Sequence, residues 1–338
     1  MIPFLFRWRD ESGGRRSNPA LMTPPTNRRR WARFAAGTLG VAAVVMLAAL
    51  AYWHFWLRWP TGTGPAGPPV DRTAFARMWT SREVFLVGMG DSITAGFGAR
   101  PGYSYFERLV RNPPEEFGEL QGVCLSRVLP KLRVTNLAVN GSTSLHHVRS
   151  QLPKLQRHTT NVLGLVLLTT GGNDLIHNYG RTPPVEGAMY GATLAAARPW
   201  IENFRLRLDG VVAAITNAFP GGCHIFLANI YDPTDGVGDI HRARLPRWPE
   251  GMEIHAAYNR VIAECAARHS RVHLVDIHAA FLGHGIHCAQ FWRPFYQSGD
   301  PHYWYHANLE DPNERGYDAL RRLFLNEIAR VLQPAAVD

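Results

Sequence analysis

Three short polar segments of the chain carry residue types suited to nucleophilic chemistry at a carbonyl group. They are Gly90-Asp91-Ser92, Asn140-Gly141-Ser142 and Gly171-Gly172-Asn173-Asp174. A serine hydroxyl attacks a carbonyl carbon once a base removes its proton, and fixed N–H donors stabilise the oxyanion that results. Gly-Asp-Ser alone is a weak turn signal. Three polar segments in succession, each directly after an apolar run, form a stronger pattern.

The elements that must position these segments are visible as apolar runs without polar alternation. These runs cover residues 84–87, 134–139 (the weakest), 162–168, 225–230 and 272–277. Such runs are typical of strands buried on both faces of a parallel sheet. Helical patterns lie between and after them, at residues 145–155, 192–218, 252–267 and 317–331. The alternation predicts an α/β fold, a three-layer doubly wound (flavodoxin-like) parallel sheet of about five strands. Ligands bind such sheets at the carboxyl ends of the strands, where the polar segments lie.

Over roughly residues 82–332 the chain resembles the SGNH or GDSL-type hydrolases. The matching blocks are GDSIT with Ser92, NLAVNGSTS with Gly141 and GGND with Asn173. The resemblance implies a serine esterase that attacks a carboxylic ester with Ser92 and forms an acyl-enzyme, without metal or cofactor. It also implies an oxyanion hole from the backbone N–H groups of Ser92 and Gly141 and the Asn173 amide. The alternative makes Gly141 a turn glycine and Asn173 a helix cap.

The fourth block departs from the pattern of that family, which ends in Asp-x-x-His-Pro-Asn-x-x-Gly-Tyr. Here Asp311 fills the histidine position and Asn308 fills the aspartate position. The base must therefore come from elsewhere or be absent. Residues i and i+2 of an extended segment face the same side, so we expect Asp300 to orient His302 toward Ser92.

Other histidines remain candidates for the base that accepts the Ser92 proton. His306 is the main alternative, and His284 and His287 are further ones. Two other functions also remain open. An O-acyltransferase would pass the acyl group to a sugar hydroxyl, and a non-catalytic surface binding module would keep the fold without a base. The expected substrate is a small-molecule, glycan or lipid ester.

The N-terminal part of the chain predicts a membrane segment. Residues 34–57 carry no formal charge, and at roughly 1.5 Å per residue they can cross a hydrocarbon core of about 30 Å. Four arginines precede this segment closely and only Arg58 follows it, which places the N-terminus in the cytoplasm and the rest outside. The expected organisation is a basic tail (1–33), a transmembrane signal anchor (34–57), a Gly/Pro linker (58–70) and a hydrolase domain (71–334). Cleavage of a signal peptide after Ala49-Leu50-Ala51 is the alternative.

Charge and composition narrow the range of partners. The formal net charge is +9, but residues 1–33 hold eight arginines against two acidic residues, so the remainder is close to neutral. A nucleic-acid partner is therefore not expected. The four cysteines all follow residue 57, and an oxidising compartment would permit one or two disulfides among them.

Three further stretches have less specific patterns. Residues 232–239 carry three carboxylates and favour a capped turn over a calcium loop. The aromatic-rich stretch 283–305 suits a pocket wall, a sugar-stacking platform or packing over the sheet. Residues 113–130 could form an insertion at the pocket entrance.

Overall fold

The structure is a computed structural model that describes residues 27–333. The chain divides into two compact units, Met1–Tyr52 and Trp53–Asp338. Helix α1 (Asn27–Tyr52) is the described element of the first unit. The stretch Arg30–Leu57, with a mean hydropathy of 2.2 over its most apolar window, is long and apolar enough to cross a membrane. A signal sequence has the same property. Most of the basic segment 1–33 lies outside the described residues.

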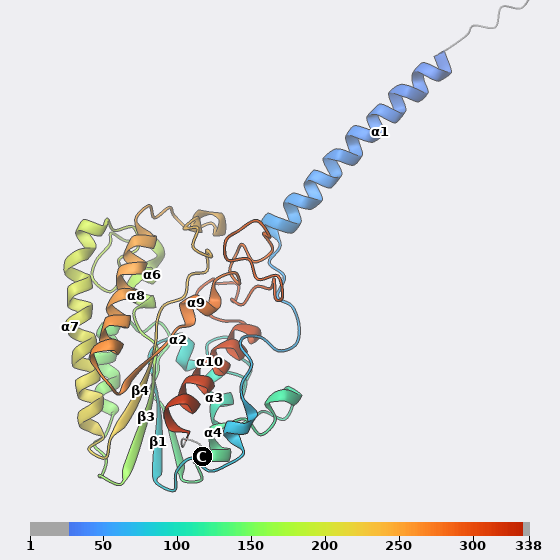
Figure 1. The fold of residues 1–338 in the computed structure, drawn as a ribbon. Coiled ribbons are helices and arrows are strands. Elements are labelled where there is room, and N and C mark those ends of the chain that lie inside the picture. The colour runs from blue at the N-terminus through green and yellow to red at the C-terminus, as the bar shows by residue number, and fades with distance from the viewer. Residues whose placement is uncertain (1–26, 334–338) are drawn as a thin grey trace, which may run out of the picture. The chain divides into compact units, whose positions relative to one another are not determined.

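The second unit is built on a sheet of five parallel strands in the order β2-β1-β3-β4-β5 (Figure 1). The strands are β1 (Glu83–Met89), β2 (Leu132–Asn136), β3 (Val162–Leu168), β4 (Cys223–Ala228) and β5 (Val272–Val275). This topology confirms the predicted doubly wound fold. The second strand begins two residues before the predicted run 134–139, because its ladder with β1 starts at Leu132 opposite Val84.

Helices cover both faces of the sheet, as Figure 1 shows. The helices of this unit are α2 (Ser92–Ala95), α3 (Tyr105–Val110), α4 (Leu125–Val128), α5 (Ser144–His146), α6 (Gly172–Ile176), α7 (Leu194–Ala218), α8 (Gly251–Arg268), α9 (Ile277–Phe281) and α10 (Glu314–Leu332). Side chains alternate between the faces of a strand. In β1, Val87 and Met89 therefore pack with α7 and α8, whereas Val84 and Leu86 pack with α3 and α10.

The predicted helix over residues 145–155 is interrupted. Helix α5 is followed by a π-helical turn at His147–Gln151 and a 3₁₀ turn at Leu152–Lys154. Pro153 has no N–H to donate and disfavours regular helix geometry in the residues before it. The irregular turn buries the side chain of Gln151 completely, and that side chain contacts the candidate site described below.

Residues 113–130 belong to the core and not to a pocket entrance. Leu120, Leu125 and Val128 are fully buried in the same cluster as α10. The buried carboxylate of Glu116 forms an ion pair with Arg321 of α10 and a second with Arg108 of α3, the latter at 2.6 Å. This stretch therefore joins α3 to α10.

The Gly/Pro stretch 58–70 is bonded to the second unit and does not hang free. The N–H of Ala66 donates to Asp318 at 3.0 Å. Arg315 donates to the carbonyl oxygens of Thr63 and Gly64 at 2.8 and 2.9 Å. The unit therefore begins well before the expected boundary at residue 71.

The structure contains four free, buried cysteines, at positions 124, 223, 265 and 288. None of the disulfides that an oxidising compartment would permit is formed. Free cysteine behaves as a small apolar residue when it is buried. Burial raises the pKa of Cys265 to about 12, which favours the unreactive thiol form.

Candidate active site

Ser92 is the first residue of helix α2, directly after the carboxyl end of β1. Asp91 caps this helix by accepting from the N–H of Ile93 at 3.1 Å. The same carboxylate accepts from the hydroxyl of Thr169, just after β3, at 2.7 Å. Burial raises the pKa of Asp91 to about 6, against the opposing effect of these hydrogen bonds. These contacts fix the turn that presents Ser92.

Gly90 must be a glycine for two reasons. Its φ is 136°, and a side chain there would collide with Thr169. Gln151 bonds both backbone groups of Gly90, accepting from its N–H at 2.9 Å and donating to its carbonyl at 2.7 Å. Sequence reasoning missed Gln151 because an irregular turn, and not helical periodicity, brings it to the site.

The second and third polar segments are joined to each other. The amide of Asn173 donates to the carbonyl oxygen of Ser142 at 3.1 Å. The buried carboxylate of Asp174 accepts from the N–H of Ser144 at 2.8 Å. Gly141 has a φ of 73°, in the left-handed region that glycine favours. The structure therefore brings Asn173 beside the backbone that follows Gly141.

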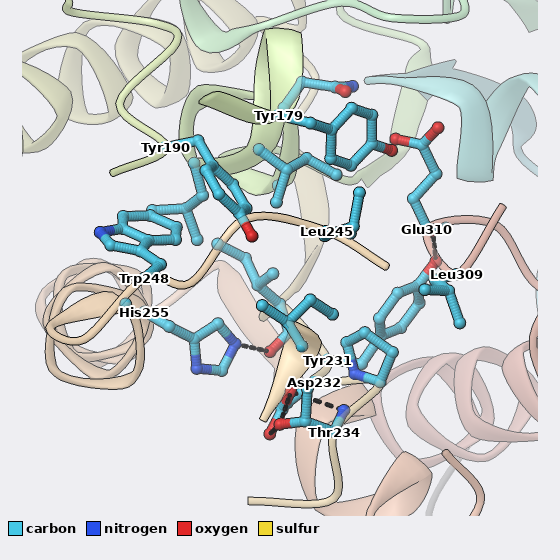
Figure 2. A pocket seen from close by; sticks show the side chains of 18 of the residues that line it. Tyr179, Tyr190, Tyr231, Asp232, Thr234, Leu245, Trp248, His255, Leu309 and Glu310 are labelled. Carbon is cyan, nitrogen blue, oxygen red and sulfur yellow. Dashed lines mark hydrogen bonds between the residues drawn. The ribbon is translucent and has the colours of Figure 1, made fainter. Parts of the chain in front are cut away.

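Ser92 and Asn173 both line a cavity with a volume of about 140 Å³. Its walls are mostly apolar and come from the ends of β1, β3 and β4 and from the loops after them. The large apolar and aromatic residues in these walls are Ile93, Leu175, Ile176, Tyr179, Tyr190, Ile230, Tyr231, Ile240, Leu245, Trp248, Met252 and Leu309. Figure 2 shows Trp248 and Tyr190 on one side of the space and Tyr179 with Glu310 on another. Such a cavity can hold an apolar group next to the serine.

A carboxylate lies beside Ser92. Asp311 is 2% exposed, and its Oδ2 accepts from the amide of Asn308 at 2.6 Å. Burial raises the pKa of Asp311, while hydrogen bonding from Ser92 and Asn308 works in the opposite direction. Within residues 27–333, Oδ1 of Asp311 has no hydrogen-bond partner. Catalytic hydrogen bonds are often loose before substrate binds.

The structure brings Asp300 and His302 together as expected, but it does not bring them to the cavity. Nδ1 of His302 bonds the Asp300 carboxylate, which Arg315 also holds at 2.5 Å. The imidazole packs against Gly62, where an added Cβ would lie 2.6 Å from the ring. His302 is also absent from the described residues that line the cavity. Gly62 thus packs against this ring, which stays about one-third exposed, and the contact with Ser92 stays a prediction.

Two of the alternative histidines, His284 and His287, contact other groups. His284 stacks on Trp304 with ring centroids 3.4 Å apart, and Nε2 of His287 lies 2.7 Å from Asp239. His306 is exposed beside Gly98, near enough to Asp311 to lower its pKa electrostatically. Of the histidines in the described part of the chain, His255 alone lines the cavity, and it bonds the carbonyl oxygen of Ile230.

Two of the three carboxylates of residues 232–239 accept from backbone N–H groups, and the third, Asp239, pairs with His287 and Arg242. Asp232 accepts from the N–H groups of Thr234 and Gly236 at 2.8 and 2.7 Å. Asp235 accepts from three N–H groups of residues 283–287. These bonds favour the predicted capped turn, although it is buried. Burial raises the pKa of Asp235 to about 7.

One group of side chains with metal-ligand chemistry occurs among the described residues. It consists of Asp209, Cys265 and His269 on and after helices α7 and α8. Arg268 already donates to Asp209 at 2.7 Å, so a cation at this carboxylate has a competitor. The group is not part of the cavity.

The aromatic-rich stretch 283–305 packs on the second unit and does not line the cavity. Tyr303, Trp304 and Tyr305 are buried in the core. Phe291 and Trp292 are exposed and contact Phe55, with ring centroids 5.7 and 4.9 Å apart. Of the expected roles, packing is the one that the structure shows.

No curated protein sequence matches the chain significantly. Solved structures with a similar fold include an extracellular lipase from Streptomyces rimosus (20% identity, 72% of this chain and 99% of that chain, TM-score 0.46). A second is phospholipase A1 from Streptomyces albidoflavus NA297 (20% identity, 73% of this chain and 100% of that chain, TM-score 0.45). A third is an acetylxylan esterase from Geobacillus stearothermophilus (19% identity, 74% of this chain and 96% of that chain, TM-score 0.44).

A family model gives the firmer assignment. The model of the GDSL-like Lipase/Acylhydrolase family matches residues 89–319. The match begins at the end of β1, just before Ser92, and continues into α10. It therefore contains all three polar segments of the site. Because it covers more than half of the sequence, the chain belongs to the GDSL-like lipase/acylhydrolase family, and its general activity is ester hydrolysis.

Proposed function

We propose that the chain is a serine esterase that hydrolyses carboxylic esters through an acyl-enzyme on Ser92. The observation that carries this proposal is the shared cavity, which Ser92 and the buried Asn173 line together below apolar walls. A nucleophile, an oxyanion donor and an acyl-sized space are what acyl transfer requires at one place.

The proposed oxyanion hole consists of the N–H groups of Ser92 and Gly141 and the side-chain amide of Asn173. Within the described part of the chain, neither N–H group has a hydrogen-bond acceptor. Both are thus able to donate to a developing oxyanion. The bond from Asn173 to Ser142 holds the third donor close to the Gly141 backbone. Donors fixed before the charge develops need little reorganisation during the reaction.

The acyl part of the substrate would occupy the apolar cavity. Leu175, Ile230 and Trp248 contribute to its walls, and each buried CH₂ of an acyl chain gains about 0.8 kcal/mol. The alcohol part would leave on the side of Ser92 that the cavity does not enclose. The substrate class is a small-molecule, glycan or lipid ester.

We also propose that α1 anchors the protein in a membrane, with the N-terminus cytoplasmic and the second unit outside. The apolar stretch Arg30–Leu57 is long enough to span a bilayer. Four arginines, at positions 28, 29, 30 and 33, lie at or close to the start of this stretch. The positive-inside rule places this end of the helix in the cytoplasm. Ester substrates outside the cytoplasm would then reach the cavity directly.

Turnover of p-nitrophenyl esters by the detergent-solubilised full chain tests the activity. We expect Ser92→Ala to lose kcat by several orders of magnitude and to lose labelling by a fluorophosphonate probe, because the nucleophile is gone. Ser150→Ala is the matched control, since Ser150 is exposed and bonds only the His146 carbonyl. A folded wild-type chain with no turnover and no label on Ser92 would instead support a non-catalytic binding module.

A further inference from the structure

Among the described residues, none of the four histidines considered as the base lines the cavity, whereas Asp311 directly follows three residues that do and lies close enough to Ser92 to be affected by it. We propose that Asp311 is the general base for Ser92, so that the site works as a serine–aspartate pair. This inference rests on the proposed esterase function and assigns the proton transfer within it.

The first support is the orientation of the Asp311 carboxylate. Asn308 donates to Oδ2 at 2.6 Å, and its side-chain oxygen accepts from the N–H of Asp311 at 3.2 Å. These two bonds tie the side chain and the backbone of Asp311 to one amide. Among the described residues, Oδ1 has no hydrogen-bond partner, although it is buried. A buried acceptor of this kind is costly unless it is used.

The second support is the place of this carboxylate. Asn308, Leu309 and Glu310, the residues just before Asp311, line the cavity together with Ser92. Ser92 is close enough to Asp311 to lower the pKa of that carboxyl. Because Oδ2 is held by Asn308, Oδ1 is the carboxylate oxygen that is free to receive the serine proton.

The third support is the electrostatic environment of Asp311. Burial raises its pKa, which makes the carboxylate a stronger base than an exposed one. The titratable groups around it are the carboxyls of Asp91 and Glu310, the imidazole of His306 and the phenols of Tyr179, Tyr231 and Tyr317. The two carboxylates oppose its ionisation, while protonated His306 favours it.

The reaction then balances with these groups alone. Asp311 accepts the Ser92 proton as Oγ bonds to the carbonyl carbon, and the carbonyl electron pair moves to the oxyanion. Collapse of this intermediate breaks the bond to the alcohol oxygen, which takes the proton from Asp311. Water next gives a proton to Asp311 and attacks the acyl-enzyme. The second collapse releases the acid, and Ser92 regains its proton from Asp311.

The test compares single variants of the full chain on p-nitrophenyl esters. We expect Asp311→Asn to lower kcat by about 10²–10⁴-fold, the usual contribution of a general base. Asp209→Asn, in α7 and outside the cavity, is the matched control and should keep wild-type kcat. His302→Ala and His306→Ala should each stay within about threefold of wild type. Melting temperatures of all variants exclude unfolding as the cause.

The pH profile gives a second readout. Activity of the wild type should fall as the pH drops through the raised pKa of Asp311, because the base becomes protonated. The double variant Asn308→Asp/Asp311→His would place an imidazole at position 311 and a carboxylate that orients it at position 308. Its activity should exceed that of Asp311→Asn. The fall of activity at acidic pH, the acid limb of the profile, should move to about pH 6–7. This rescue separates a base from a merely structural carboxylate.

Each outcome decides the question. Full activity in a folded Asp311→Asn, or loss of activity in His302→Ala or His306→Ala alone, overturns the assignment while leaving the esterase proposal intact. Loss in Asp311→Asn without any shift of the acid limb in the double variant overturns it as well, in favour of a structural role. A wild type without Ser92-dependent turnover removes both proposals together.

Discussion

At the scale of single residues, Asn173 connects the fold to the proposed chemistry. Its amide donates to Ser142 in the free protein, and it also lines the cavity beside Ser92. An amide has two N–H donors, so one can hold the backbone while the other faces the substrate. In the proposed mechanism, the same residue would hold the backbone at Ser142 and donate to the oxyanion.

We predict that Asn173→Ala lowers kcat by about 10²–10³-fold with little change in KM, because an oxyanion donor acts mainly in the transition state. Steady-state kinetics on a p-nitrophenyl ester measures both constants. Asn217→Ala, at an exposed position of α7, is the matched control. An unchanged kcat in the Asn173 variant would remove this residue from the oxyanion hole.

At the scale of elements, a buried ion cluster joins α3, α10 and the stretch 113–130. Glu116 and Asp318 face Arg108 and Arg321, and all four side chains are at most 5% exposed. Helix α10 follows directly on the segment that carries Asp311, so this cluster fixes the element behind the proposed base. Removing one partner of such a cluster leaves a buried charge uncompensated.

We predict that Glu116→Ala lowers the free energy of unfolding by about 3–5 kcal/mol. Glu115→Ala, at the exposed neighbouring position, should change it by less than about 0.5 kcal/mol. Urea denaturation at neutral pH measures both. Equal effects of the two substitutions would show that the cluster contributes no net stability.

The same carboxylate gives the cluster a pH dependence. Burial works to raise the pKa of Glu116, but hydrogen bonds from Arg108 and Arg321 outweigh it and hold the pKa below its ordinary value. The stability that this provides is present at neutral pH and is lost as the pH falls through the lowered pKa. Acidification should therefore destabilise the wild type more than Glu116→Ala.

At the scale of the whole molecule, the boundary between the two units allows the chain to be truncated before residue 53. The chain from residue 53 onward keeps the complete second unit, whereas the full chain also contains the apolar helix α1. We predict that the full chain sediments with membranes and resists carbonate extraction. The 53–338 chain should be soluble and hydrolyse p-nitrophenyl esters at nearly the same kcat. A soluble product of the full-length gene whose N-terminal residue is Tyr52 would show cleavage instead of anchoring.

A shorter chain that begins at residue 71 tests whether residues 53–70 are only a linker or contribute to the stability of the second unit. The 71–338 chain loses the bonds from Arg315 to Thr63 and Gly64 and from Ala66 to Asp318. Hydrogen bonds to charged groups contribute about 1.5–3 kcal/mol each. We therefore expect urea denaturation to show it less stable than 53–338 by about 1.5–3 kcal/mol for each of these bonds that water does not replace. Equal stability would mean that residues 53–70 only connect the two units.

The sequence by itself determined the sheet and the order of its parts. Buried strands in a parallel sheet are apolar on both faces, so runs such as 162–168 are visible without any knowledge of their neighbours. The polar segments that contain Ser92, Gly141 and Asn173 were visible for the same reason, because each follows such a run, while the roles of the three residues came from the resemblance to SGNH-type hydrolases. The edge strand β2 is only partly buried, and its position was accordingly off by two residues.

Only the tertiary structure decided what surrounds the nucleophile. The i, i+2 spacing of Asp300 and His302 gave their contact correctly, but no local pattern states that Gly62 would cover that imidazole. The neighbours of Ser92 come from remote parts of the chain: Gln151 from an irregular turn and Asp311 from the segment before α10. Contacts between distant segments depend on how the loops pack over the sheet, and spacing along the chain does not specify that packing.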